Sequence, residues 1–296
     1  MIHAPYGYLL HNIRPDSCSR GLLARQESLF SLKGAKTMQL NPMREKIPVV
    51  LVHAFPLDSR MWREQVRALS DIADIHTPNV RGFGGNRLHE KERVEDWTVG
   101  LFAFDLLQYL DKAGIDRAVL GGCSMGGYIA FEFWRRYPAR VAGMILCDTR
   151  AEADTPEARE NRRQMIERVR REGTGFLAQF ASEKLVGKTT REKNPGLVQA
   201  VAQWATEAPA ETVIGALHAL ASRPDSTDTL HTISVPVLLL FGEEDIVTPP
   251  ECGERMLNGL PNARMHLVPA AGHLSPLEAP DYVNAHVADF LRTTIV

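Results

Sequence analysis

Short runs of apolar residues alternate with helical patterns along the chain from Ile47 onward. Runs that are continuously apolar are typical of strands covered on both faces, and such strands form parallel sheets. The short run Val49–Val52 is of this kind, and stronger runs are Ala118–Gly122, Val141–Cys147 and Val235–Phe241. Ile72–Thr77 is a weaker run, and Ala263–Val268 follows the others. The alternation of strands and helices predicts an α/β fold with a doubly wound, mostly parallel sheet.

Four helical patterns lie between or after these runs. In Trp97–Ala113, apolar residues recur at spacings of three and four, and Gly114 follows as a C-terminal cap. The other patterns are Gly126–Tyr137, Cys252–Leu260 and Pro280–Arg292.

The strand pattern is interrupted after Cys147 and resumes at Val235. Thr155 and Pro156 have the residue types of a helix N-cap and a first helical residue. Further helical patterns cover Phe176–Val186, Leu197–Thr206 and Glu211–Ser222. We interpret residues 150–230 as a helical cap, inserted into a core formed by residues 41–149 and 231–296.

The first forty residues differ from the rest, because basic side chains outnumber acidic ones and serines are frequent. They lack the continuous apolar core of about 7–15 residues that a secretory signal needs. We expect a poorly ordered N-terminal extension, or a reading frame whose true start is Met38 or Met43. An organellar transit segment is the alternative. We also expect a chain that begins at Met38 to fold.

Composition and charge narrow the classes of function. Of the 296 residues, 44% are hydrophobic and 24% charged, and the formal net charge is −2. No block of like charge indicates a nucleic-acid partner, and no basic amphipathic stretch indicates a membrane partner. The longest apolar strand-like run is also far shorter than the ~20 residues that span a bilayer. The four cysteines show no metal-ligand spacing. We expect a soluble, cytoplasmic protein with reduced thiols and no metal site.

A candidate nucleophile lies where the run Ala118–Gly122 meets the following helix. Residues 122–126 read G-x-S-x-G with Ser124 at the centre, in the strand-turn-helix context that this motif requires. The turn has to be sharp for the serine hydroxyl to project above the sheet, and side chains at the two glycine positions would collide with neighbouring backbone. We therefore predict Ser124 to be a nucleophile.

A serine hydroxyl needs a neighbouring base. Asp245 follows the run Val235–Phe241, and His273 follows the run Ala263–Val268 within a Gly-flanked loop. Loops at the carboxyl ends of parallel strands converge on one crevice, so we expect His273 to be the base and Asp245 its orienting acid. Asp148, directly after the run Val141–Cys147, is a rival for the acid.

The loop after Val49–Val52 reads His53-Ala54-Phe55. This position can supply a backbone N–H to an oxyanion hole. We expect the backbone N–H groups of Phe55 and Met125 to be the two donors, and His53 to hold the loop by hydrogen bonds.

Five motifs in order give the chain a specific resemblance: His53-Ala54-Phe55, Asn79–Gly84, Gly122–Gly127, Gly242–Asp245 and Gly272-His273. Across residues 47–293 the chain resembles the α/β-hydrolase superfamily, and within it the small bacterial esterases and enol-lactonases of the 3-oxoadipate enol-lactonase type. Two positions depart from the usual pattern: Ala54 stands where a glycine is common, and Asn79 where an aspartate is common. Neither change removes Ser124, Asp245 or His273.

The resemblance implies a serine hydrolase that cleaves a small carboxylic ester or lactone through an acyl-enzyme, without metal or cofactor. A perhydrolase, a thioesterase or a C–C hydrolase could use the same residues, and a low-turnover ligand-binding receptor is the alternative outside enzymes. Four cap residues could line an acyl pocket or form the core of the cap: Phe176, Leu177, Phe180 and Trp204. The sequence leaves a homodimer open.

Overall fold

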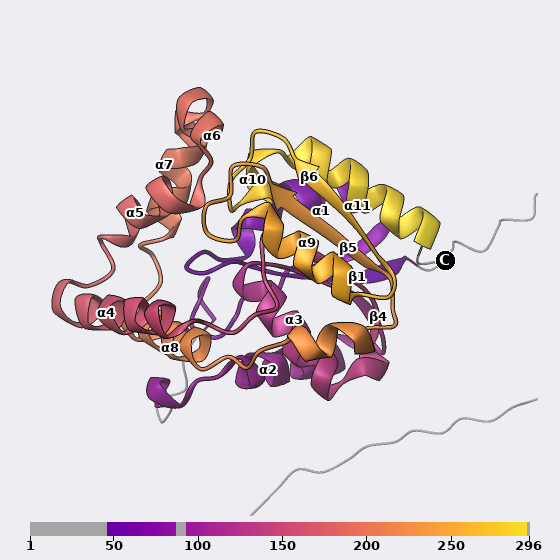
Figure 1. The fold of residues 1–296 in the computed structure, drawn as a ribbon, viewed down its shortest axis with the longest axis horizontal. Coiled ribbons are helices and arrows are strands. Elements are labelled where there is room, and N and C mark those ends of the chain that lie inside the picture. Colours follow the sequence, from indigo (N-terminus) through magenta and orange to yellow (C-terminus); the bar gives the residue numbers. More distant parts are fainter. Residues whose placement is uncertain (1–45, 87–92, 295–296) are drawn as a thin grey trace, which may run out of the picture. The chain divides into compact units, whose positions relative to one another are not determined.

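The computed structural model of this protein describes residues 46–86 and 93–294. Within them, six parallel strands form one sheet in the order β2-β1-β3-β4-β5-β6 (Figure 1). The strands are β1 (Ile47–Val52), β2 (Ala73–His76), β3 (Ala118–Cys123), β4 (Val141–Cys147), β5 (Val237–Gly242) and β6 (Ala263–Val268). The predicted fold class, an α/β fold with a mostly parallel sheet, is confirmed. The expectations about the first forty residues lie outside the described residues.

The strand order changes direction between β1 and β3, which is where an open parallel sheet forms a crevice at its carboxyl edge. The register brings the ends of neighbouring strands level at that edge: Val52 pairs with Gly122, and Cys123 pairs with Cys147. Residues that follow these strands therefore emerge close together. Ser124, Asp245 and His273 follow the carboxyl ends of β3, β5 and β6 in this way.

Strand β5 begins later than its apolar pattern suggested. The prediction placed the start at Val235, but the strand begins at Val237 because Pro236 has no backbone N–H for the ladder. The carbonyl of Pro236 still accepts a hydrogen bond from Met144 N at 2.9 Å. From Val237 to Gly242 every residue is buried, as expected for a strand covered on both faces.

Helices cover both faces of the sheet. Helices α1 (Arg63–Leu69) and α11 (Pro280–Thr294) contact each other on one side, and α2 (Val99–Ala113) and α3 (Met125–Arg136) contact each other on the other (Figure 1). Gly114 ends α2 with a left-handed backbone, φ 69°, as the sequence predicted. The remaining core helices are α9 (Pro250–Gly259) and the short α10 (Ser275–Glu278).

The chain between β4 and β5 is helical, and we call residues 150–230 the cap. Its helices gather at one end of the sheet in Figure 1. They are α4 (Pro156–Glu172), α5 (Leu177–Phe180), a π-helical turn (Ala181–Leu185), α6 (Lys188–Lys193), α7 (Pro195–Trp204) and α8 (Ala210–Ala221). The Thr155 side chain accepts a hydrogen bond from Ala158 N at 3.1 Å, so the predicted N-cap is confirmed.

Among the described residues, no helix is both long enough and apolar enough to span a bilayer.

Candidate active site

Ser124 occupies the sharp turn between β3 and α3. Its backbone has φ 53° and ψ −109°, a conformation that non-glycine residues rarely adopt, and its N–H donates to Cys147 O at 3.0 Å. A Cβ at position 122 would lie 2.1 Å from the carbonyl carbon of Gly126, and a Cβ at position 126 would lie 2.1 Å from Val52 O. Only glycine fits these two positions, which confirms the steric reason for the motif.

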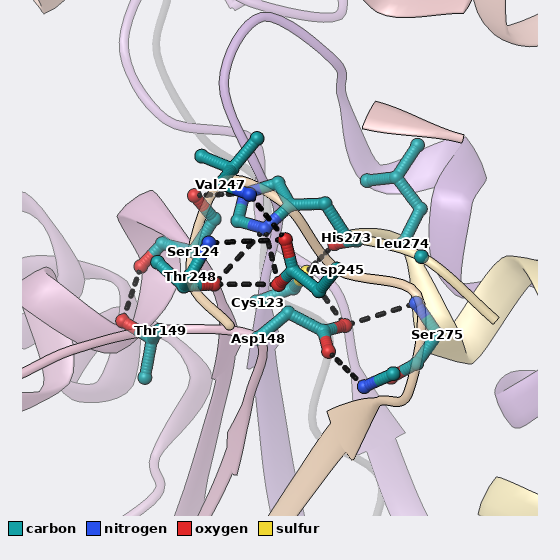
Figure 2. Close-up of polar contacts among 12 residues, drawn as sticks. Cys123, Ser124, Asp148, Thr149, Asp245, Val247, Thr248, His273, Leu274 and Ser275 are labelled. Carbon is teal, nitrogen blue, oxygen red and sulfur yellow. Dashed lines mark hydrogen bonds and ion pairs between the residues drawn. The ribbon is translucent and has the colours of Figure 1, made fainter. Parts of the chain in front are cut away.

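His273 lies between Ser124 and Asp245 (Figure 2). Its Nε2 is 2.8 Å from Ser124 Oγ, and its Nδ1 is 2.8 Å from Asp245 Oδ2. His273 and Asp245 are buried, whereas Ser124 is partly exposed. The structure therefore brings the three residues named from the sequence into one line of hydrogen bonds, with the serine at the accessible end.

Asp245 is held in place by the loop that follows it. Its Oδ1 accepts from Val247 N at 2.7 Å and from Thr248 N at 3.0 Å, and its Oδ2 accepts from Thr248 Oγ1 at 2.6 Å. Thr248 Oγ1 is also 3.0 Å from His273 Nδ1. Sequence reasoning gave Thr248 no role. The signal was available, because a threonine three residues after an aspartate can donate hydrogen bonds to its carboxylate.

The surroundings of the pair set the charge on each partner. Burial alone would lower the pKa of His273, but the charge and hydrogen bond of Asp245 and the charge of Asp148 outweigh burial, so the pKa is raised. Burial would raise the pKa of Asp245, but the His273 charge and the hydrogen bonds of His273 and Thr248 lower it. Asp245 is therefore ionised and can stabilise a protonated His273.

Asp148, the rival acid, lies below this line in Figure 2 and is fully buried. Its carboxylate accepts from Gly242 N and Ser275 N, both at 2.9 Å, rather than from His273. Burial and the charge of Asp245 raise the pKa of Asp148 to about 7. Asp148 therefore holds the backbone of the loops that carry Asp245 and His273.

Phe55 and Met125, the expected oxyanion donors, follow β1 and open α3 respectively. Met125 is the first residue of its helix, so its N–H has no partner one turn earlier in the helix. The turn that contains Phe55 is fixed by His53, whose Nε2 accepts from Val80 N at 3.0 Å and whose Nδ1 donates to Ala54 O at 3.0 Å. Burial lowers the pKa of His53 to about 4, so its ring is neutral. The expected structural role of His53 is confirmed.

A cavity of about 860 Å³ opens beside the Phe55 turn. Its walls come from three segments: Pro56–Arg60 after β1, the loop that contains Asn79 and residues 82–86, and the cap around Trp204. The Arg60 guanidinium lies 5.2 Å from the Trp204 ring centroid. Ser124 and His273 do not line this cavity. Pro56 does line it, and Pro56 is the residue after Phe55 in the chain.

Of the four cap residues considered for an acyl pocket, only Trp204 lines this cavity. Leu177 is buried in the core, and Phe176 packs under Arg168, whose guanidinium is 4.0 Å from the ring centroid. Phe180 is partly buried against the core.

In the described part of the chain, no three His, Cys, Asp or Glu side chains are arranged to hold a metal ion. Cys123, Cys147 and Cys252 are free thiols, and all three are buried.

Comparisons with known proteins identify the family of the fold. The family model described as "alpha/beta hydrolase fold" matches residues 47–280. The structure of a thermophilic esterase from Thermogutta terrifontis is 42% identical, with a TM-score of 0.81, over 85% of this chain and 92% of that one. The enol-lactonase structure from Burkholderia xenovorans LB400 is 26% identical, with a TM-score of 0.76, over 84% and 92%.

A curated relative, 3-oxoadipate enol-lactonase 1 from Acinetobacter baylyi, is 27% identical over 83% of this chain and 88% of its own length. The fold, the strand-turn-helix position of Ser124 and these matches lead to one conclusion: this chain belongs to the α/β-hydrolase fold family.

Proposed function

We propose that this protein is a serine hydrolase that cleaves a small carboxylic ester or lactone through an acyl-enzyme. The observation that carries the proposal is the line of hydrogen bonds from Ser124 Oγ to His273 Nε2 and from His273 Nδ1 to Asp245 Oδ2, each 2.8 Å long. This arrangement supplies a nucleophile, a base and a group that orients the base.

In the first step Ser124 Oγ attacks the carbonyl carbon of the substrate, and His273 Nε2 takes the hydroxyl proton. The tetrahedral intermediate then collapses, the C–O bond to the leaving group breaks, and His273 returns the proton to the leaving oxygen. A lactone keeps its leaving oxygen attached to the acyl chain. Water deacylates Ser124 by the same route, with His273 again as the base. Asp245 stays ionised throughout and stabilises the imidazolium.

The negative charge on the carbonyl oxygen needs hydrogen-bond donors. We assign this task to the backbone N–H groups of Phe55 and Met125, at the turn after β1 and at the N-terminus of α3. The N-terminal end of a helix also favours negative charge. Removal of one such donor typically lowers kcat by about 10²–10³.

The names of the similar proteins support an ester as the substrate. They are called an esterase and enol-lactonases, and these names bear out the expectation of a hydrolase that acts on ester bonds. The alternatives on the same residues remain a perhydrolase, a thioesterase and a C–C hydrolase. A low-turnover receptor needs no aligned base, so the Ser124–His273 contact argues against it.

A substrate panel tests the proposal. Purified protein is assayed at one concentration against p-nitrophenyl acyl esters, lactones and acyl thioesters, with Ser124→Ala as the control. We expect turnover of esters or lactones that Ser124→Ala loses. Turnover of thioesters alone would favour the thioesterase, and binding without turnover would favour the receptor. The cytoplasmic location, the homodimer and the small-molecule partner stay predictions.

A further inference from the structure

The loop that carries His273 is attached to the cap. We call residues 271–275 the base loop. His273 N donates to Leu185 O, at the end of the cap's π-helical turn, at 3.0 Å. Beside this bond two glycines bring their backbones together: a Cβ on Gly272 would lie 2.4 Å from Gly187 N, and a Cβ on Gly187 would lie 2.7 Å from Gly272 N. No side chain separates the cap from the base loop at this point.

Glu278, at the end of α10, joins the same two segments with one carboxylate. Its Oε1 accepts from Gly272 N at 3.0 Å and from Leu274 N at 3.1 Å, the two residues that flank His273. Its Oε2 accepts from Gly187 N, in the cap, at 2.8 Å. The carboxylate is thus bound by backbone groups on both sides of the base and by the cap.

The loop of the acid is attached to the same part of the cap. Glu244, the residue before Asp245, accepts from Thr189 N at 2.7 Å and from Thr189 Oγ1 at 2.5 Å. The cap segment 185–189 therefore contacts the loops of both residues that serve Ser124, although it supplies no atom to the line of hydrogen bonds itself.

We propose that Glu278 is a positioning residue for His273 and acts by joining the base loop to the cap at Gly187. This inference rests on the proposed function, because it takes His273 to be the base. The Nε2 of His273 has to reach Ser124 Oγ in both acylation and deacylation. The backbone of His273 is fixed by its hydrogen bond to Leu185 and by the contacts of its neighbours with Glu278 and Gly187. A shift of about 1 Å in such a group is enough to slow a reaction about 10²-fold.

Two substitutions break this joint from opposite sides. Glu278→Gln keeps the size of the side chain but replaces one acceptor oxygen by an NH₂ group, so that either the base loop or Gly187 faces a donor instead of an acceptor. Gly187→Ala places a methyl group 2.7 Å from Gly272 N, 2.8 Å from Glu244 Oε2 and 3.0 Å from Glu278 Oε2, so it also presses on the loop of Asp245, whereas Glu278→Gln acts on the Glu278 contacts alone. The backbone of Gly187, φ −62° and ψ 156°, suits alanine, so contact rather than backbone strain causes the effect.

The matched control is Gly196→Ala, in helix α7 of the same cap. A Cβ there meets only Asn194 Oδ1, at 3.8 Å, which is ordinary contact. This variant tests whether any added methyl group in the cap alters the enzyme.

The experiment reacts each full-length variant with a fluorophosphonate probe and measures its ester hydrolysis. The final amount of label counts the folded sites, and the labelling rate reports the activation of Ser124. We expect Glu278→Gln and Gly187→Ala to lower both the labelling rate and kcat per labelled site by 10-fold to about 10²-fold. Gly196→Ala should match wild type.

A purely structural role for Glu278 would lower the amount of label or the melting temperature but leave kcat per labelled site unchanged. That result in Glu278→Gln would overturn the inference, and so would an equal loss in Gly196→Ala. If the wild-type protein takes no label at Ser124, the proposed function fails instead, and the two failures are thereby distinguished.

Discussion

At the scale of single residues, two buried carboxyl groups surround His273 and differ in their hydrogen-bond partners. Asp245 binds the imidazole itself, whereas Asp148 binds the backbone of Gly242 and Ser275. The charges of both carboxylates raise the pKa of His273. Asp245 is therefore the residue that orients the ring, and Asp148 contributes charge and support.

This difference predicts unequal effects of two matched substitutions. Asp245→Asn should lower kcat by about 10⁴, because the amide cannot set the tautomer of His273. Asp148→Asn should cost much less, since it removes no contact to the ring. Both variants are compared by kcat, and their melting temperatures show whether they fold. The reverse ranking would make Asp148 the acid.

The pKa shifts predict how activity depends on pH. His273 has to be neutral to take the serine proton, so kcat/KM should fall as the pH is lowered through the pKa of His273. Because this pKa is raised, the fall should be centred above the usual histidine value of about 6.5. Asp148, with a pKa of about 7, is partly charged in this pH range, and its charge raises the pKa of His273. Asp148→Asn removes that partial charge, so the acid limb of the profile should move to lower pH.

The control for the profile is Asp111→Asn, because Asp111 is an exposed carboxylate that pairs with Arg140 on the surface. Its acid limb should coincide with that of wild type. If the acid limb of Asp148→Asn stays at the wild-type pH or moves to higher pH, the charge of Asp148 does not raise the pKa of His273.

At the scale of elements, the aromatic residues of the cap have separate surroundings. Trp204, at the end of α7, lines the cavity next to the Phe55 turn, whereas Phe176, before α5, packs under Arg168. Only Trp204 is therefore placed to contact a substrate that fills the cavity.

Substitution of these two residues should separate specificity from stability. Trp204→Ala should change the relative kcat/KM values across a series of ester chain lengths, because it reshapes the cavity wall. Phe176→Ala should lower the melting temperature and leave the relative values unchanged. A uniform loss across all chain lengths in Trp204→Ala would mean that Trp204 only holds the cap together.

The elements that the sequence predicted well are those with a strong local pattern. β4, a continuously apolar run, has the predicted bounds, and α2 ends at the predicted glycine. β6 also has the predicted bounds, although its pattern is weaker and most of it is only partly buried. α1 and α6 were missed because they are short and mostly polar, with too few apolar residues to show a period. The start of β5 was wrong by two residues because an apolar run does not report the missing N–H of Pro236.

At the scale of the whole molecule, the sheet topology made the candidate site predictable. Ser124 and His273 are 149 residues apart, yet both follow strands whose carboxyl ends share one edge. The residues that hold the site in place could not be predicted in this way. Glu278 binds Gly187, 91 residues earlier in the chain, and no local pattern indicates that contact. Convergence at a sheet edge follows from topology, but contacts between cap and core depend on the folded structure.

The most direct test of the central claim is to map the site of a fluorophosphonate probe. Ser124 is the partly exposed end of the hydrogen-bond line, and in the proposed mechanism His273 takes the proton of its hydroxyl. Peptide mapping should therefore find one labelled residue, Ser124, and Ser124→Ala should take no label while it keeps the wild-type melting temperature. Label on another residue, or undiminished label in Ser124→Ala, would contradict the account.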